Sequence, residues 1–346
     1  MNQSSQPRVS VITPVYNGAE FLAECIESIL AQTYQNWDYT IVDNCSTDGT
    51  VQVARRYAAQ DSRIRIQENQ EFLRAIPNHN RAFRAISPES KYCKMVFGDD
   101  WIFPECLEKM VALAEAHPSV GLVSAYAMEG KRVAWTGLPY SSQVIPGRQI
   151  CRQHFLEKLY VFGSATTVLY RADLVRARDP FFNEANIHAD TEACFDLLKS
   201  SDFGFVHQVL SFTRVREESL TAMSNDLQTS YGGMLQMLSA HGRAYLNEAE
   251  FNELREDYLS SYYAFLAKSL LKGRDQKFWN YHKNKLNELG DGYSRMRLAG
   301  AFVEGVSDSV LAPKKTIAKI FKTRGKRDVT QNTGSNPTGL PAKETH

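Results

Sequence analysis

Residues 9–50 read VSVITPVYNGAEFLAECIESILAQTYQNWDYTIVDNCSTDGT, and they set a pattern that the chain then repeats. The β-branched run at 9–14 predicts a buried strand that closes at a proline. Apolar residues recur at helical spacing over 20–32, which predicts an amphipathic helix. The run at 39–42 predicts a second strand, and it ends at Asp43. Strand, helix and strand in this order predict a crossover connection between parallel strands.

The same alternation continues downstream. We expect a helix at about 51–59, a strand at 64–66, a helix at 80–86 and a strand at 94–97. Alternating strands and helices favour an α/β fold whose mainly parallel sheet is flanked by helices. Ligands of such sheets bind beyond the carboxyl ends of the strands. Candidate functional residues are therefore sought where each predicted strand ends.

Two adjacent carboxylates, Asp99 and Asp100, follow the strand predicted at 94–97. Neighbouring acids that leave a core repel each other and are costly to desolvate. A divalent cation that itself holds a phosphate would account for their charge and position; a solvated turn is the alternative. Pro14 and Asp43 also fall at strand ends, so three separate segments are predicted to converge on one crevice.

Composition limits the classes of protein to consider. A chain of 346 residues favours a main domain of about 200 to 250 residues with an appendage. Its 40 basic and 39 acidic residues give a net charge of +1, which does not indicate a nucleic-acid partner. Six scattered cysteines without a CxxC motif suit a reducing cytoplasm. No signal peptide or long apolar run is evident, so we expect any membrane contact to be peripheral.

The residues at the predicted strand ends suit a nucleotide. Asp43 could accept a hydrogen bond from the imide N–H of uracil or from ribose hydroxyls, and Tyr16 offers a flat face to a base. A turn cap and simple packing are the respective alternatives. No GxGxxG follows the first strand, and GxxxxGK[ST] is absent. A phosphate would then depend on a metal, for which Asp99 and Asp100 are the candidates.

Residues 9–50 resemble the opening of the family 2 inverting glycosyltransferases with the GT-A fold. The resemblance lies in TPVYN at 13–17, SILAQT at 28–33, IVD at 41–43 and STDGT at 46–50. It continues more thinly through Asn80 and the GDD at 98–100 to about residue 220. The family implies a nucleotide-diphosphate-sugar donor, expected here to be a UDP-sugar. It also implies Mn²⁺ or Mg²⁺ and a single transfer step with inversion.

The resemblance also assigns roles to individual residues. The positions it implies for nucleotide-sugar binding are Pro14, Tyr16, Asn17, Asp43, Asn80, Asp99, Asp100 and Arg216, with Asp99 as the metal ligand. Three positions depart from the family pattern. Phe97 stands where the family has the first acid of its D-x-D motif, His79 where it often has Arg, and Arg216 where a closing loop often has His.

Residues 181–198, FFNEANIHADTEACFDLL, resemble the family's catalytic-base region. Asp190 falls on the base position and is expected to start a helix. The predicted apolar face of that helix is Cys194, Phe195, Leu197 and Leu198. The alternative is that Asp190 only stabilises the first helical turn, and His188 and Glu192 are second candidates for the base. In the acceptor half, three aromatic residues could stack on the face of an acceptor sugar, with core packing as the alternative for each: Trp135, Tyr140 and Tyr160.

The predicted organisation has four parts. Residues 1–7 form a flexible N-terminus, and 8–226 form a catalytic domain with a nucleotide-binding half (8–125) and an acceptor half (126–226). A helical appendage at 227–312 packs on that domain or pairs with a second copy. A tail at 313–346 is basic, then disordered. Its segment 314–327 has seven basic and no acidic residues, which is typical of contact with an anionic membrane surface; a solvated tail is the alternative.

The sequence thus predicts a metal-dependent, inverting glycosyltransferase that acts on a saccharide or a lipid-linked saccharide. Surface-polysaccharide assembly in the cytoplasm, at the inner face of the cell membrane, is the expected setting. One rival is a nucleotidyltransferase, which should show a Gly-rich phosphate loop near the N-terminus. The other is a catalytically impaired carbohydrate-binding relative, suggested by Phe97 and the missing His.

Overall fold

The computed structural model describes residues 6–215 and 226–311, with the side chains of 305–311 left out. Two compact units divide the chain at Met1–Glu256 and Asp257–His346. The division falls inside helix α10 (Glu248–Leu270), beyond the start of the appendage predicted at 227. The domain boundaries at 226 and 312 stay predictions.

Helix α9 (Ser230–Tyr245) belongs to the first unit. The Tyr245 hydroxyl donates to the Phe195 carbonyl, and Arg152 forms an ion pair with Glu250 at 2.6 Å. These contacts join the start of the predicted appendage to the acceptor half.

Within the described residues, the first unit contains a mixed sheet of ten strands, in the order β3-β2-β1-β4-β9-β6-β10-β5, with β7 on β6 and β8 on β10. Strands β1 (Val9–Val15), β2 (Trp37–Asp43), β3 (Ile64–Glu68) and β4 (Tyr92–Met95) are parallel. The short β9 (Leu169–Arg171) runs antiparallel between β4 and β6 (Val120–Glu129). Strand β10 (Asp202–Thr213) is parallel to β6. Strands β5 (Trp101–Ile102), β7 (Arg132–Ala134) and β8 (Val144–Ile145) complete the sheet in antiparallel pairs.

The α/β prediction is confirmed, and the first predicted strands and helices are present with shifted ends. The helix predicted at 80–86 is α3 (Ala75–Arg84), which begins earlier because Pro77 is tolerated in a first turn, where backbone N–H groups lack helical partners. Just before β9, residues 164–167 form a turn, with Thr167 N donating to Ser164 O at 2.8 Å.

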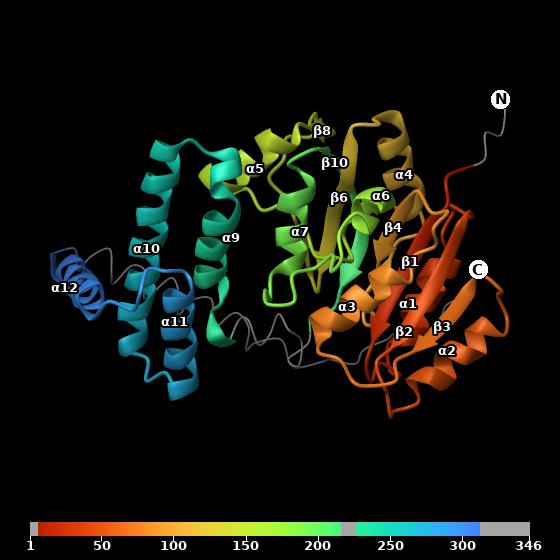
Figure 1. Ribbon diagram of the computed structural model, residues 1–346, viewed down its shortest axis with the longest axis horizontal. Helices are drawn as coiled ribbons and strands as arrows, with labels where there is room; N and C mark the ends of the chain where they lie inside the picture. Colours follow the sequence, from red (N-terminus) through yellow and green to blue (C-terminus); the bar gives the residue numbers. More distant parts are fainter. Residues whose placement is uncertain (1–5, 216–225, 312–346) are drawn as a thin grey trace, which may run out of the picture. The chain divides into compact units, whose positions relative to one another are not determined.

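Helices cover both faces of the sheet (Figure 1). Helices α1 (Leu22–Leu30), α2 (Thr50–Ala58) and α4 (Cys106–Ala116) supply one apolar core. Helices α3, α5 (Gly147–Leu156), α6 (Ala172–Arg176) and α7 (Ala189–Leu197) cover the other face. The core beneath α1, α2 and α4 is tightly packed at Gly204 of β10, because a Cβ there would lie 2.5 Å from Leu113 of α4. Phe203 and Phe205 alternate with it and contact Phe162 and Tyr126.

The second unit consists of the end of α10, α11 (Gln276–Glu288) and α12 (Arg295–Leu311). Asp275 caps α11 by accepting from Phe278 N at 2.9 Å. His282 is fully buried, and its Nδ1 lies 2.6 Å from the Tyr262 hydroxyl. Across the described residues, no helix is both long and apolar enough to cross a membrane.

Candidate active site

The carboxyl ends of β1, β2 and β4 bring three predicted site residues to one edge of the sheet. Val15 pairs with Asp43 in the parallel register, so both strands end level. After β4 the chain passes directly over β1, because a Cβ on Gly98 would lie 3.0 Å from the Val15 side chain. Pro14, Asp43 and Asp99 therefore converge, as strand-end placement predicts.

Asp43, at this edge, has one carboxylate oxygen that accepts no hydrogen bond from the described residues. Its side chain is 3% exposed, and Oδ2 accepts from Ser46 N at 3.0 Å. Oδ1 is buried and has no hydrogen-bond partner within the described part of the chain. A buried carboxylate oxygen without a donor is costly. A ligand N–H or O–H at the strand end would satisfy it.

Two exposed aromatic rings lie on the loops beside this edge. Tyr16 is 50% exposed and Phe72 58% exposed, and their rings meet edge to face with centroids 4.9 Å apart. Asn44 fixes the Phe72 loop, because its side chain exchanges hydrogen bonds with both the N–H and the carbonyl of Leu73. Sequence reasoning missed Phe72. An aromatic residue in the loop after the third strand was the available signal.

Asn17 holds the neighbouring loop. Its backbone has φ 47°, its N–H donates to Ser46 Oγ, and its side-chain oxygen accepts from Thr47 N at 2.9 Å. The side-chain oxygen is thus already engaged. Asn17 places Tyr16, and its contact with a nucleotide stays a prediction.

Asp100 is buried and fully engaged, unlike Asp43. Its Oδ2 accepts from the Thr166 hydroxyl at 2.7 Å, and its Oδ1 accepts from Arg214 N at 3.0 Å. Burial, followed by the charge of Asp99, raises the pKa of Asp100 to about 7. Arg214 also donates from Nε to the Asp99 carbonyl and pairs with Glu24. Both oxygens of Asp100 therefore serve the protein itself.

The surroundings of Asp99 are poor in further metal ligands. The ring of Phe97 lies 5.0 Å from that of His79, and burial lowers the pKa of His79 to about 4. Within the described residues, no three His, Cys, Asp or Glu side chains gather closely enough to hold a metal ion. A divalent ion fits here only if Asp99 supplies one carboxylate and the phosphates of a ligand and water supply the rest.

Asn80 and Arg216 were also predicted to bind the nucleotide-sugar. Asn80 is buried, and its amide donates to Phe182 O and Glu184 Oε1 and accepts from Phe182 N. These bonds fix the segment before α7, so its nucleotide contact stays a prediction. Arg216 and the basic segment 314–327 lie outside the described residues.

Asp190 and Glu192 lie in the first turn of α7 with opposite pKa shifts. Burial raises the pKa of Asp190, against lowering effects from Thr191 N, 2.7 Å from its Oδ1, and from the charge of His188. Burial also opposes ionisation of Glu192, but His241, Asn186 and then Asn183 outweigh it and lower the pKa to about 2. Asp190 therefore has the stronger affinity for a proton.

His188 packs on α9 rather than projecting into a ligand site. A Cβ on Gly233 would lie 2.6 Å from its ring, and its Nε2 is 3.3 Å from Thr229 Oγ1. This close packing favours a structural role for His188 over the role of base.

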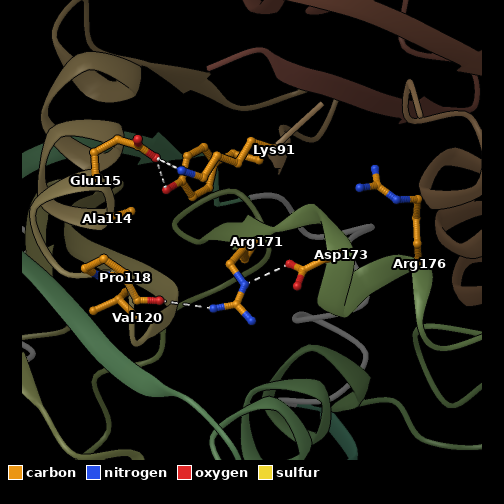
Figure 2. Close-up of a pocket in the computed structure, with 9 residues that line it drawn as sticks. Lys91, Ala114, Glu115, Pro118, Val120, Arg171, Asp173 and Arg176 are labelled. Atoms are coloured by element: carbon orange, nitrogen blue, oxygen red, sulfur yellow. Dashed lines mark hydrogen bonds and ion pairs between the residues drawn. The ribbon is translucent and has the colours of Figure 1, made fainter. Parts of the chain in front are cut away.

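A separate hollow of about 320 Å³ lies where β4 and β6 begin. Figure 2 shows residues that line it. Lys91 pairs with Glu115 at 2.6 Å, and Arg171 pairs with Asp173 at 2.8 Å. Because the hollow lies where these strands begin, it is not the site that their carboxyl ends indicate.

A family model for "Glycosyl transferase family 2" matches residues 10–178. Residues 10–178 belong to glycosyltransferase family 2. This segment of the chain contains β1 to β4 with their carboxyl ends, together with Thr166.

Among curated proteins, putative glycosyltransferase EpsE of Bacillus subtilis strain 168 is 43% identical over 115 residues, which is 33% of this chain and 41% of EpsE. The poly(ribitol-phosphate) β-N-acetylglucosaminyltransferase TarS of Staphylococcus aureus strain MW2 is 25% identical over 181 residues, which is 51% of this chain and 30% of TarS. The chain spans less than half the length of the first curated relatives it matches.

Solved structures share the fold. The crystal structure of S. aureus TarS 1–349 in complex with UDP-GlcNAc has a TM-score of 0.63 at 15% identity, covering 89% of this chain and 92% of that one. The mannosyltransferase PcManGT of Pyrobaculum calidifontis, in complex with GDP-Man and Mn²⁺, has a TM-score of 0.54 at 16% identity, covering 92% and 85%. The predicted GT-A architecture is confirmed.

Proposed function

We propose that this chain is an inverting glycosyltransferase that moves a sugar from a UDP-sugar to a saccharide or lipid-linked saccharide. The observation that carries the proposal is the buried, unpartnered Oδ1 of Asp43 beside the exposed Tyr16–Phe72 pair. The N3–H of uracil would satisfy Oδ1, and the rings would cover the base. The UDP-GlcNAc complex of TarS supports the same choice of nucleotide.

The donor diphosphate would extend from Asp43 along the sheet edge toward Asp99. Mn²⁺ or Mg²⁺, when bound between Asp99 and the diphosphate, would neutralise charge on the leaving group. The Mn²⁺ in PcManGT supports this assignment. Arg216 would contact the diphosphate, because a guanidinium pairs well with phosphate.

Asp190 would act as the base. It takes the proton of the acceptor hydroxyl as that oxygen attacks the anomeric carbon, and the bond from that carbon to the diphosphate oxygen breaks. A raised pKa suits this role, since a base is most effective with a pKa near the working pH. Glu192, whose pKa is near 2, would remain ionised and fix the turn.

The acceptor would lie on the α7 side of the sheet. Tyr140 is 81% exposed, and its ring rests 5.2 Å from that of His207. The two nitrogens of His207 lie 2.9 Å from the Tyr126 hydroxyl and the Ser142 carbonyl, so the support is rigid. An exposed, rigidly held ring suits the apolar face of a sugar. Trp135 and Tyr160 remain further candidates.

The names of the relatives support surface-polysaccharide assembly as the setting. We place the enzyme in the cytoplasm, at the inner face of the membrane, with segment 314–327 on anionic lipid. Residues 227–312 are the proposed surface for pairing with a second copy.

Calorimetry with UDP, GDP and CDP, each with and without Mn²⁺, tests the donor. We expect UDP to bind most tightly, because CDP lacks a ring N–H at the corresponding position. Preference for GDP, or no binding of any nucleotide, would contradict the proposal.

A catalytically impaired carbohydrate-binding relative is the second candidate, because Phe97 packs against His79 where the family has an acid. Binding of UDP without hydrolysis or transfer of a UDP-sugar, across a panel of acceptors, would favour it.

A further inference from the structure

Lys94 is a fully buried lysine in the middle of β4 whose partners are backbone carbonyls. Its amine donates to Thr166 O at 2.7 Å and reaches Val168 O at 3.4 Å. Burying an ammonium group without a carboxylate is costly, and an apolar side chain would avoid that cost. The amine therefore needs an explanation beyond packing.

Thr166 links β4 to the two acids. Its backbone carbonyl accepts the hydrogen bond from Lys94. The hydroxyl accepts from Phe97 N at 3.2 Å and donates to Asp100 Oδ2 at 2.7 Å. Asp100 in turn accepts from Arg214 N, and Arg214 Nε donates to the Asp99 carbonyl at 3.1 Å. A continuous set of hydrogen bonds thus runs from the core to the backbone of Asp99.

We propose that Lys94 and Thr166 are positioning residues that aim the Asp99 carboxylate at the donor diphosphate. Asp100 then connects Thr166 to Arg214 through hydrogen bonds and does not bind the metal. The two acids of the GDD sequence have separate tasks: Asp99 faces the ligand, and Asp100 fixes the turn. This inference rests on the proposed function, because it assigns the contact between Asp99 and a diphosphate.

Removing the Thr166 hydroxyl should displace Asp99 selectively. In Thr166→Val, Phe97 N and Asp100 Oδ2 both lose a buried partner, so the turn relaxes. The nucleoside subsite at Tyr16 and Asp43 is built on β1 and β2, and it is held by hydrogen bonds from Ser46 N and Thr47 N rather than by Thr166. Binding of the diphosphate should fall while binding of the nucleoside stays.

The test compares UDP and uridine by calorimetry, both with Mn²⁺, in wild type, Thr166→Val, Thr166→Ser and Thr167→Val. Thr167 is the matched control, because it is equally buried and its hydroxyl lies 3.3 Å from Ser164 Oγ, away from the acids. We expect Thr166→Val to lower the UDP affinity about 10-fold and the uridine affinity less than about 2-fold. Thr166→Ser should restore UDP binding, and Thr167→Val should leave the UDP-to-uridine ratio unchanged.

An unchanged ratio in Thr166→Val, or equal losses for both ligands in Thr166→Val and Thr167→Val, would overturn the inference. Wild type that binds neither ligand would instead overturn the proposed function, and the inference with it. Lys94→Met tests the first bond separately. It should shift the UDP-to-uridine affinity ratio in the same direction as Thr166→Val. A folded Lys94→Met protein with the wild-type ratio would show that Lys94 is not a positioning residue.

Discussion

Acids follow the ends of both β2 and β4, but the two sites differ in whether a buried carboxylate oxygen lacks a hydrogen-bond partner. Asp43 leaves one buried oxygen without a partner, whereas both oxygens of Asp100 are occupied by Thr166 and Arg214. The two acids of α7 differ in their pKa: donor side chains outweigh burial and lower the pKa of Glu192, whereas burial raises that of Asp190. We propose that an unused acceptor, rather than position at a strand end, marks Asp43 as the ligand-facing acid of the first pair.

The largest effect should separate the two acids of α7. Asp190→Asn should lower kcat by about 10²- to 10⁴-fold with donor affinity retained, because the general base is lost. The assay is transfer of sugar from UDP-sugar at saturating acceptor. The matched variant Glu192→Gln should keep turnover closer to wild type at pH 7. The reverse order of the two losses would move the base to Glu192.

Asp43→Asn tests the unused oxygen at the end of β2. The amide keeps the shape but exchanges a charged acceptor for a neutral group, so uridine binding should fall by about 10- to 100-fold. Calorimetry with uridine measures the loss, and Asp48→Asn is a control, since Asp48 already accepts from Ala19 N and Thr50 N. Uridine affinity that is equal in wild type and Asp43→Asn would place the base elsewhere.

Alternating apolar strands and helices predicted the α/β fold and the edge where the acids lie, because periodicity reports which face of each element is buried. The Thr166–Asp100 contact spans 66 residues of sequence. It depends on the short antiparallel β9 being inserted between β4 and β6, which no local pattern encodes. For the same reason, the sequence could not show that both oxygens of Asp100 accept hydrogen bonds while Oδ1 of Asp43 accepts none. Phe72 was missed because its neighbour Tyr16 lies on a different loop.

Glu192 should make stability depend on acid pH. Its folded pKa of about 2 lies below the usual value of 4.5, so its contribution is present above about pH 4.5 and is lost as pH falls toward 2. Glu192→Gln should therefore cost up to about 3 kcal/mol of unfolding free energy at pH 7 and little near pH 2.5. Urea unfolding at both pH values measures the difference. A cost that does not change with pH would mean that packing, not ionisation, explains the loss.

The smallest effect is expected at Tyr140, where an exposed ring rests on a partly buried His207. Tyr140→Ala should raise the acceptor KM by about 2- to 10-fold, the range of one aromatic contact of about 0.5 to 1.5 kcal/mol, while kcat and UDP affinity stay unchanged. Tyr140→Phe should retain the wild-type KM, because the ring and not the hydroxyl would meet the sugar. Val133→Ala is a control that trims another exposed apolar side chain of the acceptor half, 47% exposed. If Tyr140→Ala and Val133→Ala shifted the acceptor KM equally, the ring would have no specific part in acceptor binding, and Tyr160, which packs on His154 at 4.8 Å, would be the next ring to test.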